Sequence, residues 1–236
     1  MLKKMKLSVV IPVFNEIKFI DKCIKEVLGA KRFDLDLEII ISDNNSNDGT
    51  KEFLKKINNP LIKILLQETN YGKGSNITNA FKFVTGDIIL IQDADLEYSP
   101  EDYEDLLKPI INQRADVVFG NRFSGSKPFH VYSLAHYFVN RFVTFFFNIL
   151  YNRSFSDVLT GYKVFNSNVL KKVNLMSRGF DIETEITSKI VKISDIRIYE
   201  VGVSIYSRRY NEGKKVHWHH LFIILFSIIK WKLIKK

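Results

Sequence analysis

Cysteine is nearly absent from this sequence, which has a single one, Cys23, in 236 residues. One thiol cannot form a disulfide within the chain, so a small secreted domain stapled by disulfides is excluded. Cys23 lies in a helical pattern of apolar residues, where we expect it to pack in the core. The cysteine content therefore favours a reducing compartment.

Long apolar runs are absent as well. No segment reaches the roughly 20 apolar residues that a helix needs to span a bilayer. The apolar run at 7–14 follows several lysines and resembles a signal peptide. Pro12 interrupts this run, however, no small-residue cleavage site follows it, and Asn15 and Glu16 end it. We therefore expect a cytoplasmic protein.

Acidic residues are scarce in the C-terminal segment 201–236. It holds eight Lys and Arg residues and one acid, Glu212, for a net charge of +7. The remaining 27 basic and 25 acidic residues nearly balance, so most of the formal net charge of +9 lies in this segment. A basic segment of this kind suits an anionic partner, which means phosphate groups, acidic lipid or nucleic acid.

Apolar residues make up 46% of the chain, enough for the core of one large α/β domain. Short apolar runs typical of buried strands alternate with segments of helical periodicity. This alternation predicts a parallel, doubly wound sheet flanked by helices. The predicted strands are 7–13, 37–42, 61–66, 88–92, 115–120 and 196–206, and the predicted helices are 16–30, 50–57, 74–84, 100–113, 130–151 and 179–193.

Three acids follow the predicted strand at 88–92 at alternate positions: Asp93, Asp95 and Glu97. Open α/β sheets bind ligands beyond the carboxyl ends of their strands, where these side chains are expected. Carboxylates so close together repel one another unless a cation joins them. Mg²⁺ or Mn²⁺ suits the place, because one or two carboxylates and substrate phosphates suffice to hold it. The alternative is a solvated acidic loop, since an Asp-x-Asp pair often arises by chance.

Polar residues also follow other predicted strands. Asn15 and Glu16 come after the first strand and Asp43 after the second. Such side chains hydrogen-bond a ribose or a base edge, or else they form an ordinary helix entry. The segment Gly72–Gly74 allows close approach of backbone around Lys73. It lacks the Walker spacing, so that type of phosphate loop is excluded and a surface turn is the alternative.

Four motifs stand in order along the chain: PVFNE at 12–16, DNNSNDGT at 43–50, NYGKG at 70–74 and QDADLEY at 92–98. In this order they resemble the inverting nucleotide-sugar glycosyltransferases of family 2, which have the GT-A fold. DVLTGYKVF at 157–165 and YSRRYNEGKK at 206–215 are similar to the polyprenyl-phosphate subgroup, the dolichyl-phosphate mannose and glucose synthases. The resemblance covers about residues 7–232. Each motif is weak alone, but together they are specific.

On the donor side, the resemblance implies a nucleoside pocket and a metal site. Asp95 is expected to bind Mg²⁺ or Mn²⁺, assisted by Glu97, which stands where the family often has Gln. Phe14 replaces a common Tyr and lacks its phenol hydrogen bond, and Asn44 replaces a common second Asp, which bears on nucleotide preference. The residues expected to bind the nucleotide-sugar are Pro12, Phe14, Glu16, Asp43, Lys73 and Asp93.

On the acceptor side, the resemblance implies that Arg122, Arg208 and Lys214 face phosphate groups. A polyprenyl phosphate is ionised at neutral pH and attacks the anomeric carbon with little need for a base. Catalysis then consists of alignment and charge stabilisation. A hydroxyl acceptor does need a base, for which Asp157 and Glu183 are candidates. The predicted catalytic residues are Asp93, Asp95, Asp157 and Arg208.

Two segments are candidates for membrane contact. The predicted helix at 130–151 is crowded with Phe, and it either packs in the core or lies on the membrane beside the loop 123–129. The tail 217–236 is apolar from 221 to 229, carries two Trp and ends in lysines. This pattern suits a helix in the membrane interface. A helix docked on the domain is the alternative.

We therefore predict a GT-A-like catalytic domain at 1–216, with the acceptor loop and Phe-rich helix at about 123–152, and a C-terminal amphipathic helix at 217–236. The predicted function is metal-dependent transfer of a hexose from a UDP- or GDP-sugar to a polyprenyl phosphate at the cytoplasmic membrane face. A separate membrane protein is a further candidate partner. The alternatives are a soluble glycosyltransferase acting on a glycan hydroxyl in surface polysaccharide synthesis, and a basic membrane- or nucleic-acid-binding protein. A basic membrane- or nucleic-acid-binding protein would have no use for acids clustered at a strand end. We therefore expect no nucleic-acid partner.

Overall fold

The computed structural model describes residues 4–128, 130–131, 133–206 and 220–234. The strands are β1 (Lys6–Val13), β2 (Asp36–Asp43), β3 (Ile62–Leu66), β4 (Ile88–Ile91), β5 (Val117–Asn121), β6 (Lys163–Asn166) and β7 (Ile198–Gly202). The helices are α1 (Ile20–Gly29), α2 (Thr50–Leu54), α3 (Lys73–Phe81), α4 (Tyr103–Ile111), α5 (Leu134–Tyr151), α6 (Ser167–Leu170), α7 (Ile182–Ile190) and α8 (His220–Leu233), with a 3-10 turn η1 (Pro100–Asp102) before α4.

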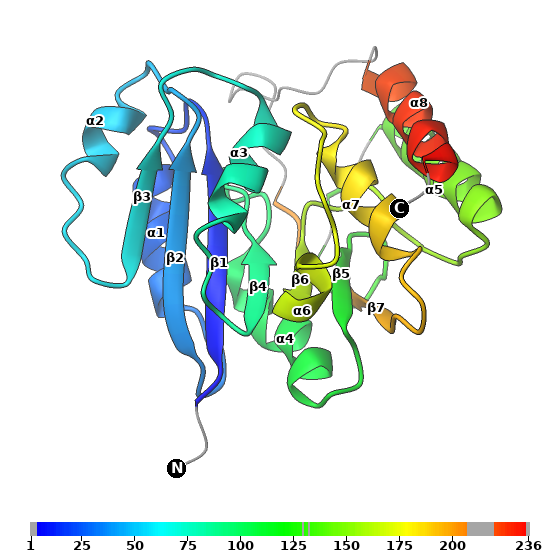
Figure 1. Ribbon diagram of the computed structural model, residues 1–236, viewed down its shortest axis with the longest axis horizontal. Helices are drawn as coiled ribbons and strands as arrows, with labels where there is room; N and C mark the ends of the chain where they lie inside the picture. Colours follow the sequence, from blue (N-terminus) through cyan, green and yellow to red (C-terminus); the bar gives the residue numbers. More distant parts are fainter. Residues whose placement is uncertain (1–3, 129, 132, 207–219, 235–236) are drawn as a thin grey trace.

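The strands form one mixed, mainly parallel sheet in the order β3-β2-β1-β4-β6-β5-β7 (Figure 1). The pairs β1–β2, β1–β4, β2–β3 and β5–β7 are parallel, whereas β6 runs antiparallel to both β4 and β5. β1 and β4 are apolar along nearly their whole length because helices cover both faces of the sheet. The predicted doubly wound α/β sheet is confirmed.

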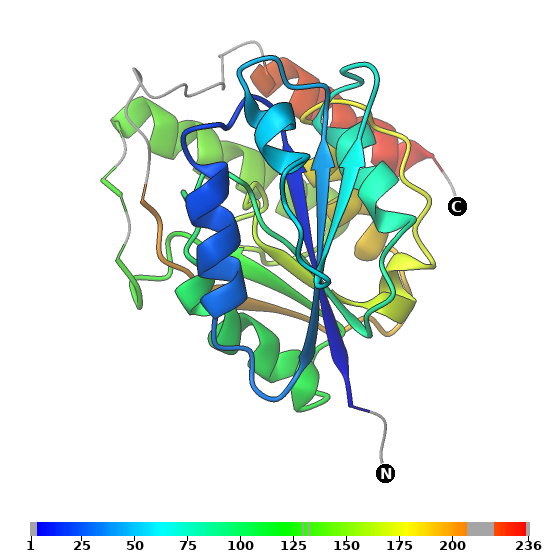
Figure 2. The same cartoon turned by 90° about the vertical axis from the view of Figure 1, so that its left-hand side faces the viewer.

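Helices pack on both faces of the sheet (Figure 2), and each face has its own apolar core. One core joins α1, α2 and α4 to the side chains at alternate strand positions such as Val9 and Ile39. The other core joins α3, α5, α6, α7 and α8 to the intervening positions such as Val10 and Ile40. Successive strand residues point to opposite faces, so a run without polar breaks serves both cores.

Two parts of the structure differ from the sequence-based prediction. β6 and α6 were not predicted. β6 has only two apolar residues, Val164 and Phe165, between Lys163 and Asn166, and the four residues of α6 are too few to establish a helical period. The first helix was predicted from Glu16, but α1 begins at Ile20. Asn15 has φ +56°, and the Glu16 carbonyl accepts bonds from the backbone N–H of Phe19 and Ile20, so a turn precedes the helix.

α5 and α8 each have one face in the core and one exposed apolar face. α5 buries Val143 and Phe147, and α8 buries Ile228 and Trp231. The two helices are joined where the Tyr151 hydroxyl donates to the Ile228 carbonyl at 3.0 Å. One face of each helix therefore packs in the core, and contact of the exposed face with a membrane stays a prediction. Within the described ranges, no helix combines the length and apolarity that crossing a bilayer requires.

Candidate active site

The parallel strands bring the predicted site residues to one edge of the sheet. β1 pairs with β2 so that Val13 lies opposite Asp43, and with β4 so that Val10 lies opposite Ile91. The backbone N–H of Asn44 donates to the Val13 carbonyl at 2.9 Å, so the pairing of β1 with β2 continues to the ends of both strands. The loops that follow these three strands therefore leave the sheet together, at the edge where such folds bind ligands.

Asp43 holds together the loops after β1 and β2. It is fully buried, and its carboxylate accepts bonds from Ser46 N (3.0 Å) and Ser46 Oγ (2.5 Å). Ser46 Oγ accepts in turn from Asn15 N at 2.8 Å. These bonds satisfy backbone N–H groups of both loops within the protein. The structure thus brings Asp43 close to the Pro12–Glu16 segment, and a contact of Asp43 with a nucleoside stays a prediction.

The other residues predicted for the nucleoside side differ in exposure. Pro12 is buried within β1 and shapes the strand end. Glu16 is also buried, and its backbone N–H donates to Thr50 Oγ1 at 3.1 Å. Phe14 is half-buried at the edge. Of these three, Phe14 has the most side-chain surface to offer a base or ribose.

Asn76 of α3, which the sequence analysis missed, joins the ends of β1 and β2. Its Nδ2 donates to the carbonyls of Val13 (3.3 Å) and Ser42 (2.8 Å), and its Oδ1 accepts from Gln67 Nε2 (2.6 Å). A buried amide costs free energy unless it is hydrogen-bonded, so these bonds fix the strand ends against α3. The sequence carries one signal for this role: Asn76 precedes Ala80 by four residues and therefore lies on the same, buried face of the helix.

The three acids after β4 lie in a tight turn. Leu96 at its centre has φ +57°, and Asp95 Oδ1 accepts a bond from Glu97 N at 3.1 Å. Asp93, Asp95 and Glu97 are each half-buried, so their carboxylates reach both protein and solvent. This position is compatible with a ligand site, and the choice between such a site and a solvated acidic loop stays a prediction.

Gln92 anchors the start of this turn. Its side chain is fully buried, and its Oε1 accepts from the hydroxyls of Tyr103 (2.9 Å) and Tyr162 (2.5 Å). Its Nε2 donates to the carbonyls of Asp93 (3.0 Å) and Tyr98 (3.1 Å), which closes the loop on itself. The acids therefore sit on a rigid support, as positioned functional groups need.

A chain of alternating charges runs from Asp93 into the core, and we call it the Asp93–Lys163 network. Lys73 Nζ lies 2.9 Å from Asp93 Oδ1 and 3.1 Å from Glu183 Oε1. Glu183 Oε2 pairs with Lys163, whose side chain is fully buried. Burial opposes the charge on Lys73, but Asp93 and Glu183 outweigh it and raise the pKa of Lys73. Burial likewise opposes the charge on Glu183, but its two lysines lower the pKa of that carboxyl.

The glycines around Lys73 allow close approach to this chain's own backbone. Gly72 has φ +94°, and a Cβ added at Gly72 or Gly74 would collide with the carbonyl of Arg178 or Ser177. The Arg178 carbonyl accepts from Gly74 N at 2.8 Å. The segment before α7 thus seats on the start of α3, which brings Glu183 to Lys73. The predicted freedom for close approach is present, and the segment before α7 uses it.

Arg122 and Asp157 form a buried ion pair with two parallel bonds. Arg122 Nε donates to Asp157 Oδ2 (2.6 Å), Nη2 donates to Oδ1 (2.7 Å), and Arg122 N also donates to Oδ2 (3.2 Å). The Asp157 carboxylate is fully buried, and its backbone N–H donates to Glu200. This arrangement favours a role for Asp157 in orienting the guanidinium of Arg122 over a role as a base.

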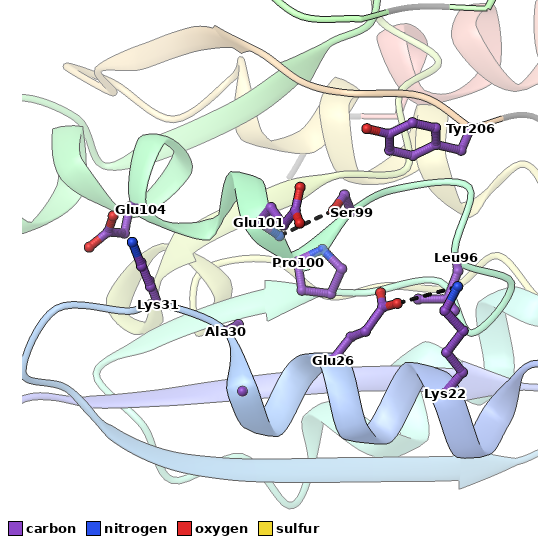
Figure 3. A pocket seen from close by; sticks show the side chains of 11 residues that line it. Lys22, Glu26, Ala30, Lys31, Leu96, Ser99, Pro100, Glu101, Glu104 and Tyr206 are labelled. Carbon is purple, nitrogen blue, oxygen red and sulfur yellow. Dashed lines mark hydrogen bonds and ion pairs between the residues drawn. The ribbon is translucent and has the colours of Figure 1, made fainter.

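A cavity of about 810 Å³ adjoins the acidic turn on the α1 side of the sheet (Figure 3). Tyr206 lines it at the top of the view and Leu96 at the right. The charged residues of its lining are two lysines and three glutamates, so the lining is net acidic and does not favour phosphate: Lys22, Lys31, Glu26, Glu101 and Glu104. Arg208 and Lys214, predicted to contact phosphate, lie outside the described residues.

The acids of the turn fit a hard divalent cation. No three His, Cys, Asp or Glu side chains form a metal cluster in the part of the chain that the structure describes. Mg²⁺ needs fewer protein ligands than that, because it keeps waters and binds through one or two carboxylates and substrate phosphates. Asp95 and Glu97 carry carboxylate oxygens of the type that Mg²⁺ prefers, whereas Asp93 is paired with Lys73. The donor set therefore suits Mg²⁺ or Mn²⁺ shared with a diphosphate.

The fold matches solved glycosyltransferase-like structures over nearly the whole chain. The TM-score is 0.71 to glucosyl-3-phosphoglycerate synthase from Mycobacterium tuberculosis, at 16% identity over 98% of this chain and 80% of that one. It is 0.70 to mannosyl-3-phosphoglycerate synthase from Rubrobacter xylanophilus, at 18% identity over 96% and 72%. At such low identity these matches show the fold, which is GT-A-like as predicted.

The sequence defines the family. The family model for glycosyl transferase family 2 matches residues 8–173, and the chain belongs to this family. The dolichol-phosphate mannosyltransferase of Pyrococcus furiosus is 27% identical over 97% of this chain and 65% of its own length. The low-salt glycan biosynthesis hexosyltransferase Agl6 of Haloferax volcanii is 28% identical over 94% and 53%. The chain thus spans about half to two thirds of the length of these relatives.

Proposed function

We propose that this chain transfers a hexose from a nucleotide-sugar to a polyprenyl phosphate, with inversion at the anomeric carbon. The choice of a phosphate acceptor rests on the ion pairs of the two candidate bases, Asp157 and Glu183. Asp157 accepts three bonds from Arg122, and Glu183 lies between two lysines. Each carboxylate is thus occupied by cations of the chain itself, so neither is placed to take the proton of a hydroxyl acceptor. An acceptor that is already ionised does not need a base.

The donor side of the proposal rests on the family and on the strand-end loops. The structural neighbour from M. tuberculosis was solved with Mn²⁺ and uridine diphosphate, which supports a nucleotide diphosphate donor and a divalent ion. Asp95 and Glu97 would hold that ion, and when bound it would neutralise the diphosphate leaving group. Lys73 adds a cation at the same edge, and Phe14 offers a surface for the nucleoside.

The acceptor side rests on Arg122 and on the names of relatives. Dolichol phosphate appears in the name of the P. furiosus relative. Undecaprenyl phosphate appears in the name of an arabinose-derivative transferase of Photorhabdus laumondii that is 38% identical over 48% of this chain and 36% of its own length. Asp157 fixes two nitrogens of the Arg122 guanidinium, which pre-organises this cation at the end of β5. A fixed guanidinium suits the recognition of a phosphate oxygen. The residues Arg208 and Lys214 remain predicted contacts of the same phosphate.

The attachment of the protein to the cytoplasmic face of a membrane is also part of the proposal. α5 exposes Phe138, Phe142, Phe145 and Ile149, and α8 exposes Phe222, Phe226, Ile229 and Leu233. Both sets have the spacing i, i+4, i+7, i+11, so each forms a single stripe along its helix. Figure 1 shows α5 and α8 packed together at one end of the molecule. Apolar stripes accompanied by Lys230 and Lys232 suit anionic lipid.

The reaction is tested with labelled UDP- and GDP-sugars, polyprenyl phosphate and Mn²⁺. We expect one donor to yield labelled lipid, and EDTA to abolish the yield. The matched control is the polyprenol without its phosphate, which should accept no sugar. Transfer to the polyprenol or to a glycan hydroxyl at a comparable rate would overturn the choice of acceptor.

Membrane binding is tested by flotation with phosphatidylglycerol-containing vesicles. Deleting α8 is a poor test, because Ile228 and Trp231 belong to the core. The variant Phe142→Ser with Phe226→Ser keeps the core and should lower the partition at least about tenfold, since each buried Phe contributes about 1.5–3 kcal/mol. Phe33→Ser, which changes an exposed Phe outside both stripes, is the control. An unchanged partition would refute membrane contact. A dimeric unaltered chain that becomes monomeric in the variant would also refute it, because the stripes would then form a protein interface.

A further inference from the structure

The buried half of the Asp93–Lys163 network has no direct place in the proposed reaction. Lys163 is fully buried beneath the site, where it donates to the Thr160 carbonyl and pairs with Glu183. A buried ion pair is costly to desolvate, and apolar residues of similar volume often replace one without loss of stability. Stability alone is therefore a weak reason for an ion pair at this position.

The two halves of the network meet at Lys73, which Asp93 and Glu183 share. Lys73 Nζ is 2.9 Å from Asp93 and 3.1 Å from Glu183. Lys73 Nζ lies on the Oε1 side of Glu183, at ion-pair distance. Glu183 thus attracts the ammonium group through charge, while its other oxygen is fixed by Lys163. Any change in the charge of Glu183 or Lys163 changes how strongly Lys73 binds Asp93.

Asp93 has little freedom to respond in another way. A Cβ added at Gly161 would lie 2.7 Å from Asp93 Oδ2, so one carboxylate oxygen faces backbone and the other faces Lys73. The Gly161 N–H donates to the Tyr98 hydroxyl at 2.7 Å, which holds that backbone in place. Lys73 is therefore the adjustable contact of Asp93.

We propose that Glu183 and Lys163 are positioning residues that divide Lys73 between Asp93 and the donor diphosphate. The inference rests on the proposed donor site. The two positive and two negative charges of the network cancel. The positive potential that Lys73 presents to the diphosphate is therefore smaller than that of an isolated lysine. Without the negative charge of Glu183, the site becomes more positive and Asp93 is held more firmly. Without the positive charge of Lys163, the site becomes more negative and Lys73 is drawn away from the diphosphate.

The experiment measures the affinity for UDP and GDP by calorimetry, with and without Mn²⁺. Glu183→Gln should bind the preferred nucleotide about threefold or more tightly, and Lys163→Met should bind it about threefold or more weakly. The double variant removes both charges and should return to within about twofold of the unaltered chain. In sugar transfer, Glu183→Gln should lower kcat while KM for the donor falls, because Asp93 is less available to the sugar.

Opposite signs distinguish this role from a structural one. A structural ion pair would weaken binding in both single variants, and the double variant would not recover; that result would overturn the proposal. Lys189→Met is the matched control, because it breaks the Lys189–Glu185 pair on the same helix without touching the network. It should leave the affinity unchanged, and a similar shift in this variant would also refute the proposal.

Two further experimental results also decide whether the inference holds. If Lys163→Met does not fold, Glu183→Gln and the double variant still have to differ in affinity by about threefold, and equal affinities would refute the inference. If the unaltered chain binds neither UDP nor GDP with Mn²⁺, the donor site fails and this inference fails with it. If the unaltered chain binds the nucleotide but the affinities of Glu183→Gln and Lys163→Met do not shift in opposite directions, only the positioning role is overturned. The proposed transfer then remains intact.

Discussion

Replacing Asp157 by Asn separates an anchoring carboxylate from a catalytic base. Asp157 is fully buried and Arg122 is 13% exposed, and three bonds of 2.6–3.2 Å join them. The variant turns an amide N–H₂ group toward the donors of Arg122 and leaves the guanidinium without its counter-charge. Breaking a buried pair from one side costs about 3–5 kcal/mol. For a chain of this length the melting temperature should fall by on the order of 10 °C.

The chain contains a matched control for this variant. Asp116 accepts from Arg197 through the same three donors, the backbone N–H, Nε and Nη2, at 2.8–3.1 Å. This pair is exposed, with Arg197 at 52%. Exposed pairs contribute about 0–1 kcal/mol, so Asp116→Asn should shift the melting temperature only slightly. The difference between the two variants measures the effect of burial on one hydrogen-bond pattern.

The assay combines calorimetric unfolding with sugar transfer at a temperature well below both transitions. We expect Asp157→Asn to lose stability while kcat stays within about tenfold of the unaltered chain. Removing a general base costs about 10²–10⁴ in rate. A loss of that size in kcat, or a loss of stability no greater than that of Asp116→Asn, would refute the anchoring role.

Three further predictions concern the metal, the acidic turn and pH. Asp95→Asn should abolish Mn²⁺-dependent transfer with little change in melting temperature, and a variant that keeps full activity would exclude Asp95 as a ligand. Gly161→Ala should lower kcat at least about tenfold, because the new methyl group displaces Asp93, whereas Gly29→Ala in open space should leave kcat unchanged, and equal rates in the two variants would contradict this. Burial alone would raise the pKa of Glu38, but hydrogen bonds from its neighbours outweigh this and lower it to about 2. Because this pKa lies below the unfolded value, Glu38 stabilises the fold above about pH 5 and this contribution, about 2 kcal/mol, is lost as the pH falls toward 2. Glu38→Gln should therefore flatten the acid branch of the stability curve measured by urea unfolding, and an unchanged slope would contradict this assignment.

Local patterns in the sequence predicted most of the sheet. Apolar runs at 7–13, 37–42 and 88–92 correspond to β1, β2 and β4, because a strand covered on both faces has to be apolar throughout. β6 was not predicted because its apolar run is only Val164 and Phe165, whereas β4, of the same length, is apolar throughout. Its antiparallel direction leaves no signal in the sequence either. Its reversal nevertheless places Lys163 at the edge where the other strands end.

The candidate site was predictable in its residue types and less so in its contacts. The carboxyl-end rule located the Asp93–Glu97 turn and Asp43 at one edge, and the structure brings them there. The rule gave no information on partners. Glu183 was considered as a base, yet it lies between Lys73 and Lys163, 110 and 20 residues away in sequence.

The sequence by itself determined the class of fold, the edge of the sheet where the polar residues gather and the glycosyl transferase family 2 motifs. These features depend on residues close to one another along the chain, which spacing and periodicity reveal. Only the tertiary structure decided which charges are paired: Arg122 with Asp157, and Lys73 shared between Asp93 and Glu183. It also decided which stripes of α5 and α8 face away from the core. The energy of a charge or of an apolar side chain depends on its surroundings, and those surroundings come from segments far apart in the sequence.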